Sequence, residues 1–87
     1  MSTYLVTGAN SGIGKETVRA LLRKGGHVLM VCRSEKRAAM AISDLKAENS
    51  PGTIELHLAD LSSIADIRRV STAIRNKHEK LDVLINN

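Results

Sequence analysis

Apolar and polar residues alternate in blocks along this chain of 87 residues, and the blocks predict alternating strands and helices. Short apolar runs favour strands over residues 4–7, 28–32, 53–58 and 81–85. The intervening segments have the spacing and the start and stop signals of helices over residues 13–24, 34–48 and 63–78. The order βαβαβαβ with short connections indicates an α/β protein, in which helices cover a parallel sheet.

The apolar pattern of each strand also predicts its place in the sheet. Residues 28–32 and 83–85 are apolar on both faces, as inner parallel strands are. The third strand instead alternates Ile54, Leu56 and Leu58 with Glu55 and His57, which favours an edge. We therefore predict the strand order 3-2-1-4, the first half of a Rossmann-type doubly wound sheet.

The last predicted strand has neither charge nor alternation, although the order 3-2-1-4 places it at an edge. Exposed edges are usually protected by charge, proline or a bulge. The sequence stops at Asn87, directly after this strand. We therefore expect residues 1–87 to be the N-terminal part of a single Rossmann-fold domain, truncated after the fourth strand.

Capping signals mark the predicted helices. The pattern of the first helix places Ile13, Thr17 and Leu21 on successive turns, and Gly25 with Gly26 would end it. Ser34 is a predicted N-cap of the second helix. For the third helix, the run from Ser63 to Asp66 resembles a capping box with Asp in place of Glu.

Composition narrows the function classes. Tyr4 is the only aromatic residue, which argues against binders of single-stranded nucleic acid that stack bases on aromatic side chains. The net charge of +4 comes from basic residues scattered over presumed helix surfaces, so no nucleic-acid partner is predicted. No apolar run is long enough to cross a membrane. A lone Cys32 and the lack of a signal peptide favour an intracellular, cytoplasmic setting.

A glycine-rich loop joins the first strand to the first helix. Gly8, Gly12 and Gly14 would let the backbone turn tightly and approach a phosphate, and the helix N-terminus offers free N–H groups to an anion. A tight turn alone could explain the glycines. Their position at the head of a βαβ unit favours nucleotide binding.

The spacing G-x-x-x-G-x-G of residues 8–14 closely resembles the cofactor loop of the short-chain dehydrogenase/reductase family. Asp60-Leu61 after the third strand resembles a second motif of this family, and Asn86-Asn87 resembles the start of its Asn-Asn-Ala-Gly motif. The resemblance covers the whole chain. The run Val31-Cys32-Arg33 is most similar to the retinol dehydrogenase-like branch.

The resemblance implies a role for each matching residue. The three glycines would shape the turn, and the ribose and pyrophosphate would be lined by Asn10, Ser11 and Ile13. Asp60 and Leu61 would meet the adenine, while Asn86 and Asn87 would support the sheet beside the adenosine ribose. Asp60 could instead be a loop acid before a helix cap, and the two asparagines could be ordinary turn residues.

The residue after the second strand predicts which dinucleotide is bound. An NAD site usually offers a carboxylate to the ribose 2′-OH there, but this chain has Cys32 followed by Arg33. An arginine can hold a 2′-phosphate through a planar, charge-assisted fork. We therefore predict NADP(H) rather than NAD(H) as the cofactor; the alternative is that Arg33 points into solvent.

The chain lacks candidate catalytic groups. The resemblance implies hydride transfer between a carbonyl or alcohol substrate and the nicotinamide, with a Ser and a Tyr-x-x-x-Lys pair that would follow residue 87. Tyr4 has no lysine four residues later, and His27, His57 and His78 show no metal-ligand spacing, so we predict neither catalysis nor a metal site within this chain. The main hypothesis is the NADP(H)-binding portion of an oxidoreductase; alternatives are a stand-alone, non-catalytic nucleotide-binding module and a basic nucleic-acid binder.

Overall fold

The computed structural model describes residues 2–10 and 12–85 as a parallel sheet with helices on both faces. The strand order is β3-β2-β1-β4, and every pair is parallel. This confirms the predicted α/β class and the first half of a doubly wound sheet. The elements, in chain order, are β1 (Thr3–Thr7), α1 (Gly12–Arg23), β2 (His27–Cys32), α2 (Glu35–Ala47), β3 (Thr53–Leu58), α3 (Ile64–Lys77) and β4 (Val83–Ile85).

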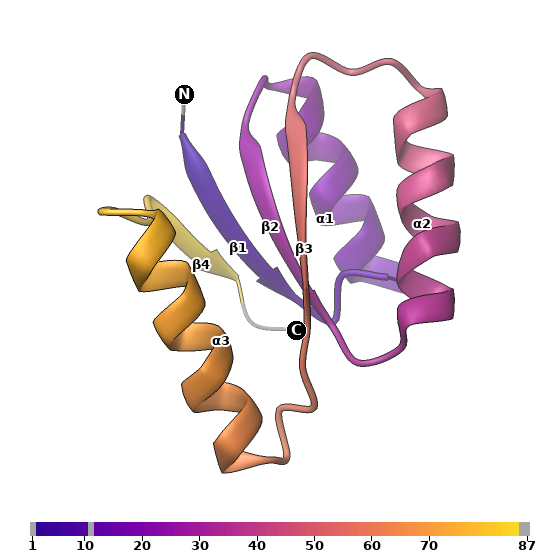
Figure 1. Cartoon of the computed structure of the whole chain (residues 1–87). Coiled ribbons are helices and arrows are strands. Elements are labelled where there is room, and N and C mark those ends of the chain that lie inside the picture. Colours follow the sequence, from indigo (N-terminus) through magenta and orange to yellow (C-terminus); the bar gives the residue numbers. More distant parts are fainter. Residues whose placement is uncertain (1, 11, 86–87) are drawn as a thin grey trace.

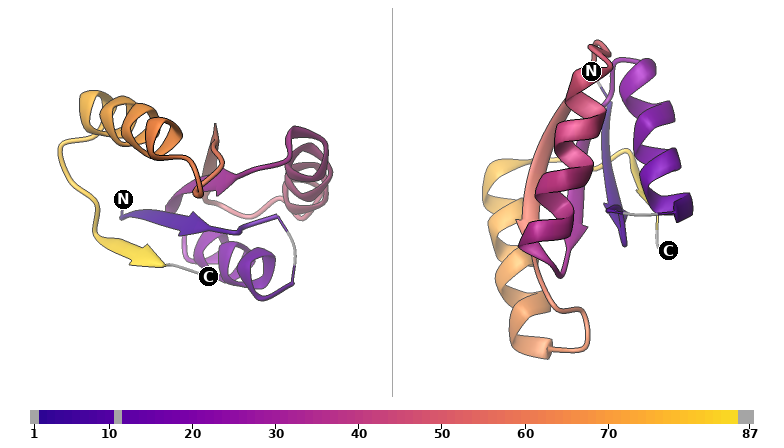
Figure 2. Two further views of the ribbon diagram at one scale, coloured as in Figure 1. Left: turned by 90° about the horizontal axis from the view of Figure 1, so that it is seen from below. Right: turned by 90° about the vertical axis from the view of Figure 1, so that its right-hand side faces the viewer.

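The sheet separates two hydrophobic clusters. Helices α1 and α2 cover one face and α3 covers the other (Figures 1 and 2). Alternate residues of β2 enter the two clusters, because successive side chains of a strand point to opposite faces: Val28 and Met30 pack under α1 and α2, while Leu29 and Val31 pack under α3. Apolar residues on both faces explain why β2 is an uninterrupted hydrophobic run.

Helix α1 buries the row of residues one position after Ile13, Thr17 and Leu21. Gly14, Val18 and Leu22 face the sheet and are buried, whereas Ile13 is 79% exposed. The buried residues are spaced by four, so they form one row along the helix. Ile13, which the family resemblance assigns to the lining of the cofactor, lies at the exposed start of the helix.

Strand β3 lies at the edge of the sheet, as its alternating pattern predicted. Ile54, Leu56 and Leu58 pack against the cluster beneath α1 and α2. Glu55 and His57 therefore point to the face that α3 covers only in part, and both are half-buried.

Strand β4 starts at Val83 rather than at Leu81, where the apolar pattern placed its start. The Asp82 backbone N–H donates to the Thr3 carbonyl at 2.9 Å, and the Thr3 N–H donates to Oδ2 of Asp82 at 2.7 Å. A side-chain carboxylate thus takes the acceptor role that a main-chain carbonyl has in a regular ladder, and pairing with β1 begins one residue later.

The helix ends agree with the capping signals. The Ser34 hydroxyl accepts a hydrogen bond from the Arg37 N–H at 3.2 Å, as expected of an N-cap. Gly25 ends α1 with a φ of 83°, and the next N–H, that of Gly26, donates to the Leu21 carbonyl at 3.0 Å. This positive φ is the left-handed conformation that glycine adopts at low cost.

Candidate functional site

The loops that follow β1, β2 and β3 meet at one edge of the sheet. Parallel strands end on the same side, so the glycine loop, residues 33–34 and residues 59–63 are neighbours there (Figure 1). Strands β2 and β3 extend the sheet from one side of β1, and β4 from the other. The end of β1 is therefore the point where the strand order reverses, and ligands of open α/β sheets bind outside the carboxyl ends of the strands at such a point.

Two glycines of the loop have backbone conformations that other residues adopt at a cost. The φ angles are 59° for Gly8 and 56° for Gly12. A Cβ placed on Gly12 would meet no atom within 4 Å, so the conformation rather than crowding calls for glycine. The Gly8 N–H donates to the Val31 carbonyl at 3.2 Å, which ties the start of the loop to β2.

The amino end of α1 has the electrostatics of an anion site. Its first turn, Gly12–Lys15, contains no acidic residue. The first N–H groups of a helix lack intrahelical acceptors and lie at the positive end of the helix dipole. The exposed side chain of Ile13 lies in this first turn, so an apolar surface is available next to the N–H groups.

A polar hollow beside the glycine loop is lined by Asn10, Arg33, Ser34 and Arg37. The Arg33 side chain is 82% exposed, and Asn10 is half-buried. Two guanidinium groups and the amide of Asn10 are suited to an anion such as a phosphate monoester. The structure thus brings together the predicted cofactor residues Asn10 and Arg33, which are 23 positions apart in the sequence.

Asp60 holds a fixed position at the end of β3. Its Oδ1 accepts hydrogen bonds from the Ser62 N–H at 2.9 Å and the Ser62 hydroxyl at 2.7 Å. Its Oδ2 lies 4.0 Å from Nε of Arg33. The hydrogen bonds from Ser62 and, more weakly, the charge of Arg33 lower the pKa of Asp60 from its ordinary value.

The start of α3 also anchors Asp60, in a way that the capping-box pattern did not predict. The Ser63 hydroxyl accepts from the Asp66 N–H at 3.2 Å, as expected. The Asp66 carboxylate, however, accepts from the Asp60 N–H at 2.9 Å instead of returning to the Ser63 N–H, which donates to the Asp60 carbonyl. The helix cap therefore fixes both backbone polar groups of Asp60.

Of the remaining predicted cofactor residues, two lie within the part of the chain that the structure describes. Gly14 is buried in α1, and Leu61 is 45% exposed next to Asp60. Ser11, Asn86 and Asn87 lie outside the described residues.

Two reactive side chains lie outside this hollow. Burial raises the pKa of the Cys32 thiol, although a backbone hydrogen bond involving Ala9 opposes the shift. Tyr4 lies near the other end of β1, where a Cβ on Gly26 would come within 2.7 Å of its Cε2 atom. Cys32 lies next to the glycine loop but is buried with a raised pKa, and Tyr4 lies at the far end of β1, so neither group is suited to general acid–base chemistry in the hollow.

One constellation was missed in the sequence. His27, Glu55 and His78 come together at the amino end of the sheet, although the histidine spacing indicated no metal ligands. The residues lie on three elements and are 23 to 51 positions apart, so no local motif could reveal them. The period-2 alternation of β3, which places Glu55 on the α3 face, was the one available signal.

Known proteins resemble this chain in sequence and in fold. The sequence model of the family described as short chain dehydrogenase matches residues 2–87. Human dehydrogenase/reductase SDR family member 13 is 42% identical over 85 residues, which cover 98% of this chain and 22% of that protein. Human retinol dehydrogenase 13 is 38% identical over 85 residues, covering 98% of this chain and 26% of that protein.

A solved structure, the Pseudomonas aeruginosa RhlG/NADP active-site complex, superposes with a TM-score of 0.85 at 35% identity. The match covers 99% of this chain and 34% of that one. The chain thus spans between a fifth and about a third of the length of these relatives. Within the described residues, no helix is long and apolar enough to cross a membrane. The chain belongs to the short-chain dehydrogenase/reductase family, with its similarity on the retinol dehydrogenase-like branch.

Proposed function

We propose that this chain is the NADP(H)-binding part of an oxidoreductase that interconverts a carbonyl and an alcohol. The observation that carries the proposal is the meeting of the glycine turn and the Arg33 hollow at the carboxyl ends of β1 and β2. A family relative that retains the same fold forms a complex with NADP. When bound, the cofactor would supply the hydride.

The described residues fit the adenosine half of such a cofactor. The N–H groups at the start of α1 would bind the pyrophosphate, since this first turn has no competing carboxylate. Arg33 would hold the 2′-phosphate from the adjoining hollow. The hydrogen bonds from Ser62 and with the cap of α3 would hold Asp60, and with it the loop after β3, next to the adenine.

Specificity for NADP(H) would come from charge. An acid at the end of β2 would repel a 2′-phosphate, but this position holds Arg33. The carboxylate of Asp60 lies 4.0 Å from Arg33, near enough to orient the guanidinium. Most of that side chain nevertheless remains exposed to an incoming ligand.

The chemistry of proton transfer would come from residues that this chain does not carry. Its single tyrosine, Tyr4, lies at the opposite end of β1 from the glycine loop. The chain would therefore bind the cofactor without turning over a carbonyl substrate. This separates the proposal from one in which residues 1–87 are a complete catalyst.

Mapping the binding surface by NMR tests this proposal. Titration of the labelled chain with NADPH should shift the amide signals of Gly8, Gly12 and Arg33 in a saturable way. The amide signals of residues 49–53, at the other end of the sheet, should stay in place. Shifts confined to that other end, or none at cofactor concentrations that saturate the family's enzymes, would contradict the proposed site.

A further inference from the structure

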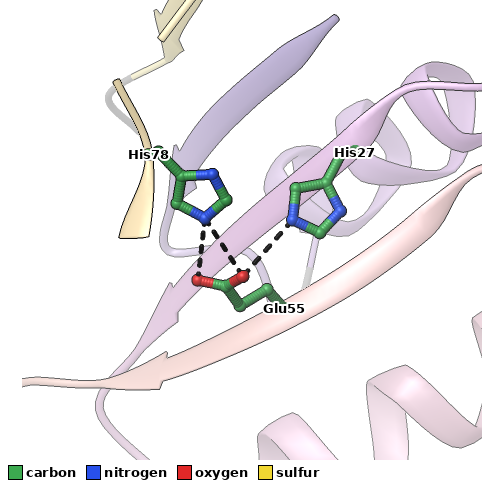
Figure 3. Close-up of side chains that lie close together, drawn as sticks. All are labelled: His27, Glu55 and His78. Carbon is green, nitrogen blue, oxygen red and sulfur yellow. Dashed lines mark hydrogen bonds and ion pairs between the residues drawn. The ribbon is translucent and has the colours of Figure 1, made fainter. Parts of the chain in front are cut away.

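Three polar side chains converge at the amino end of the sheet, far from the glycine loop. His27 begins β2, Glu55 lies on β3, and His78 directly follows α3. Figure 3 shows both imidazoles directed at the Glu55 carboxylate. The side chains are only 20%, 12% and 16% exposed, respectively, so the cluster is shielded but reachable from solvent.

The distances suit a metal ion. The Nε2 atoms of His27 and His78 lie 3.3 Å and 3.1 Å from Oε1 of Glu55. In a tetrahedral zinc site with bonds of about 2.0–2.2 Å, neighbouring ligand atoms are about 3.4 Å apart. All three ligand atoms lie within 4.8 Å of one another, and His78 lies just beyond the end of α3.

The surroundings of His27 resemble the outer shell of a metal site. Its Nδ1 lies 2.6 Å from the Thr53 hydroxyl, on the strand paired with β2. In the tautomer with the proton on Nδ1, this nitrogen donates to the Thr53 hydroxyl, and Nε2 carries the lone pair that a metal ion needs. Nε2 is the nitrogen that faces Glu55.

Glu55 supplies the negative charge. Its carboxylate lies within hydrogen-bonding or ion-pair distance of four side chains, those of His27, His57, Lys77 and His78. Lys77 Nζ lies 3.0 Å from Oε1 and would compete with a metal for that oxygen, whereas His57 lies 2.6 Å from Oε2 and would hold the carboxylate in place.

We propose that His27, Glu55 and His78 bind a transition-metal dication of the zinc type, with water completing the coordination. Two imidazoles and one carboxylate are a ligand set for such ions, while Mg²⁺ and Ca²⁺ prefer all-oxygen sites. The site joins the end of α3 to β2 and β3. It is independent of dinucleotide binding, since it lies at the opposite end of the sheet.

Calorimetric titration of the metal-free full chain with Zn²⁺ alone tests the proposal. We expect saturable binding of one ion per chain, no heat of binding with Mg²⁺, and a tetrahedral absorption spectrum with Co²⁺. His27→Gln and His78→Gln should each weaken Zn²⁺ binding more than about 10-fold. Circular dichroism of every variant verifies that the fold is retained.

Two further variants separate this site from general binding to histidine. His57→Gln removes the third histidine of the chain, which contacts the Glu55 carboxylate but is not itself a proposed ligand, so it should keep one ion per chain and lose less affinity than either ligand variant. Lys77→Met removes the competitor for Oε1 and should tighten binding. Absence of saturable binding by the folded unmodified chain, or equal losses in the His57 and His78 variants, would overturn the proposal and leave a purely structural hydrogen-bond cluster.

Discussion

Nε of Arg33 lies 4.0 Å from Oδ2 of Asp60, where β2 and β3 end side by side. An exposed cation and a fixed carboxylate therefore face each other at the edge that carries the glycine loop. Such an exposed pair adds little to folding stability, because solvent screens it. Its value would lie in orienting the Arg33 guanidinium toward a ligand.

Replacement of Arg33 by Ala should weaken NADP⁺ binding by about 10- to 100-fold, because a hydrogen-bonded ion pair with the 2′-phosphate is lost. Binding of NAD⁺, which has no 2′-phosphate, should change little. Arg23→Ala is the matched control, since it removes the same charge from an exposed position at the far end of α1. Both affinities can be measured by calorimetry, and equal losses for the two cofactors would show that Arg33 does not read the phosphate.

Replacement of Gly12 by Ala should reduce stability by about 1–2 kcal/mol, because a Cβ disfavours its φ of 56°. Gly25→Ala should cost a similar amount, since Gly25 has a φ of 83° and equally open surroundings. The two variants should differ in ligand binding. Only the Gly12 variant should bind NADPH more weakly, which urea denaturation and calorimetry together would show; a similar loss of binding in both would remove the specific role of the loop.

The pKa of Asp60 should respond more to Ser62 than to Arg33. Hydrogen bonds from Ser62 are the main cause that lowers this pKa from 3.8, and the charge of Arg33 is the smallest. Ser62→Ala should therefore raise the midpoint of the Asp60 carboxyl titration, followed by NMR, further than Arg33→Ala does. The reverse order would mean that the ion pair, and not the turn, fixes the carboxylate.

The same shift has a consequence for stability. Since the folded-state pKa of Asp60 lies below its ordinary value of 3.8, the ionised group stabilises the fold above that pH. This contribution is lost as the pH falls through the folded-state pKa. Asp60→Asn should accordingly flatten the acid limb of the curve of unfolding free energy against pH, and an unchanged limb would contradict the assignment.

The packing of α3 against the sheet should depend on the buried face of the helix, which carries Val70 and Ile74. Ile74 is 7% exposed on the face of α3 that packs against the sheet, whereas Ile64 is 70% exposed at the start of the helix. Ile74→Ala should cost about 2–4 kcal/mol of unfolding free energy, because it leaves a cavity, while Ile64→Ala should change it by less than about 0.5 kcal/mol. Urea denaturation measures both, and similar costs would show that α3 packs differently.

Local signals predicted most of this fold. Strand alternation located β3 at the edge, and Ser34, Ser63 and Gly25 marked helix ends, because caps and turns involve residues close in sequence. The start of β4 was misplaced because a contact between Asp82 and Thr3, 79 residues apart, decides it. An apolar pattern reports burial and carries no information about such a bond.

Part of the candidate site could likewise be predicted from the sequence, and part could not. The glycine loop and Arg33 could be picked out from their positions relative to predicted strands, and the structure places Asn10 and Arg33 on one hollow. The attachment of Asp60 to the cap of α3 and the meeting of His27, Glu55 and His78 arise only when the sheet is assembled. Neither had a sequence spacing to reveal it.

The most direct test of the account compares the affinities of 2′,5′-ADP and 5′-AMP for the chain. The two ligands differ only in the 2′-phosphate that Arg33 would hold, and neither needs the nicotinamide half of the site. We predict that 2′,5′-ADP binds at least about 10-fold more tightly, as a charge-assisted contact requires. Equal affinities, or tighter binding of 5′-AMP, would contradict NADP(H) specificity.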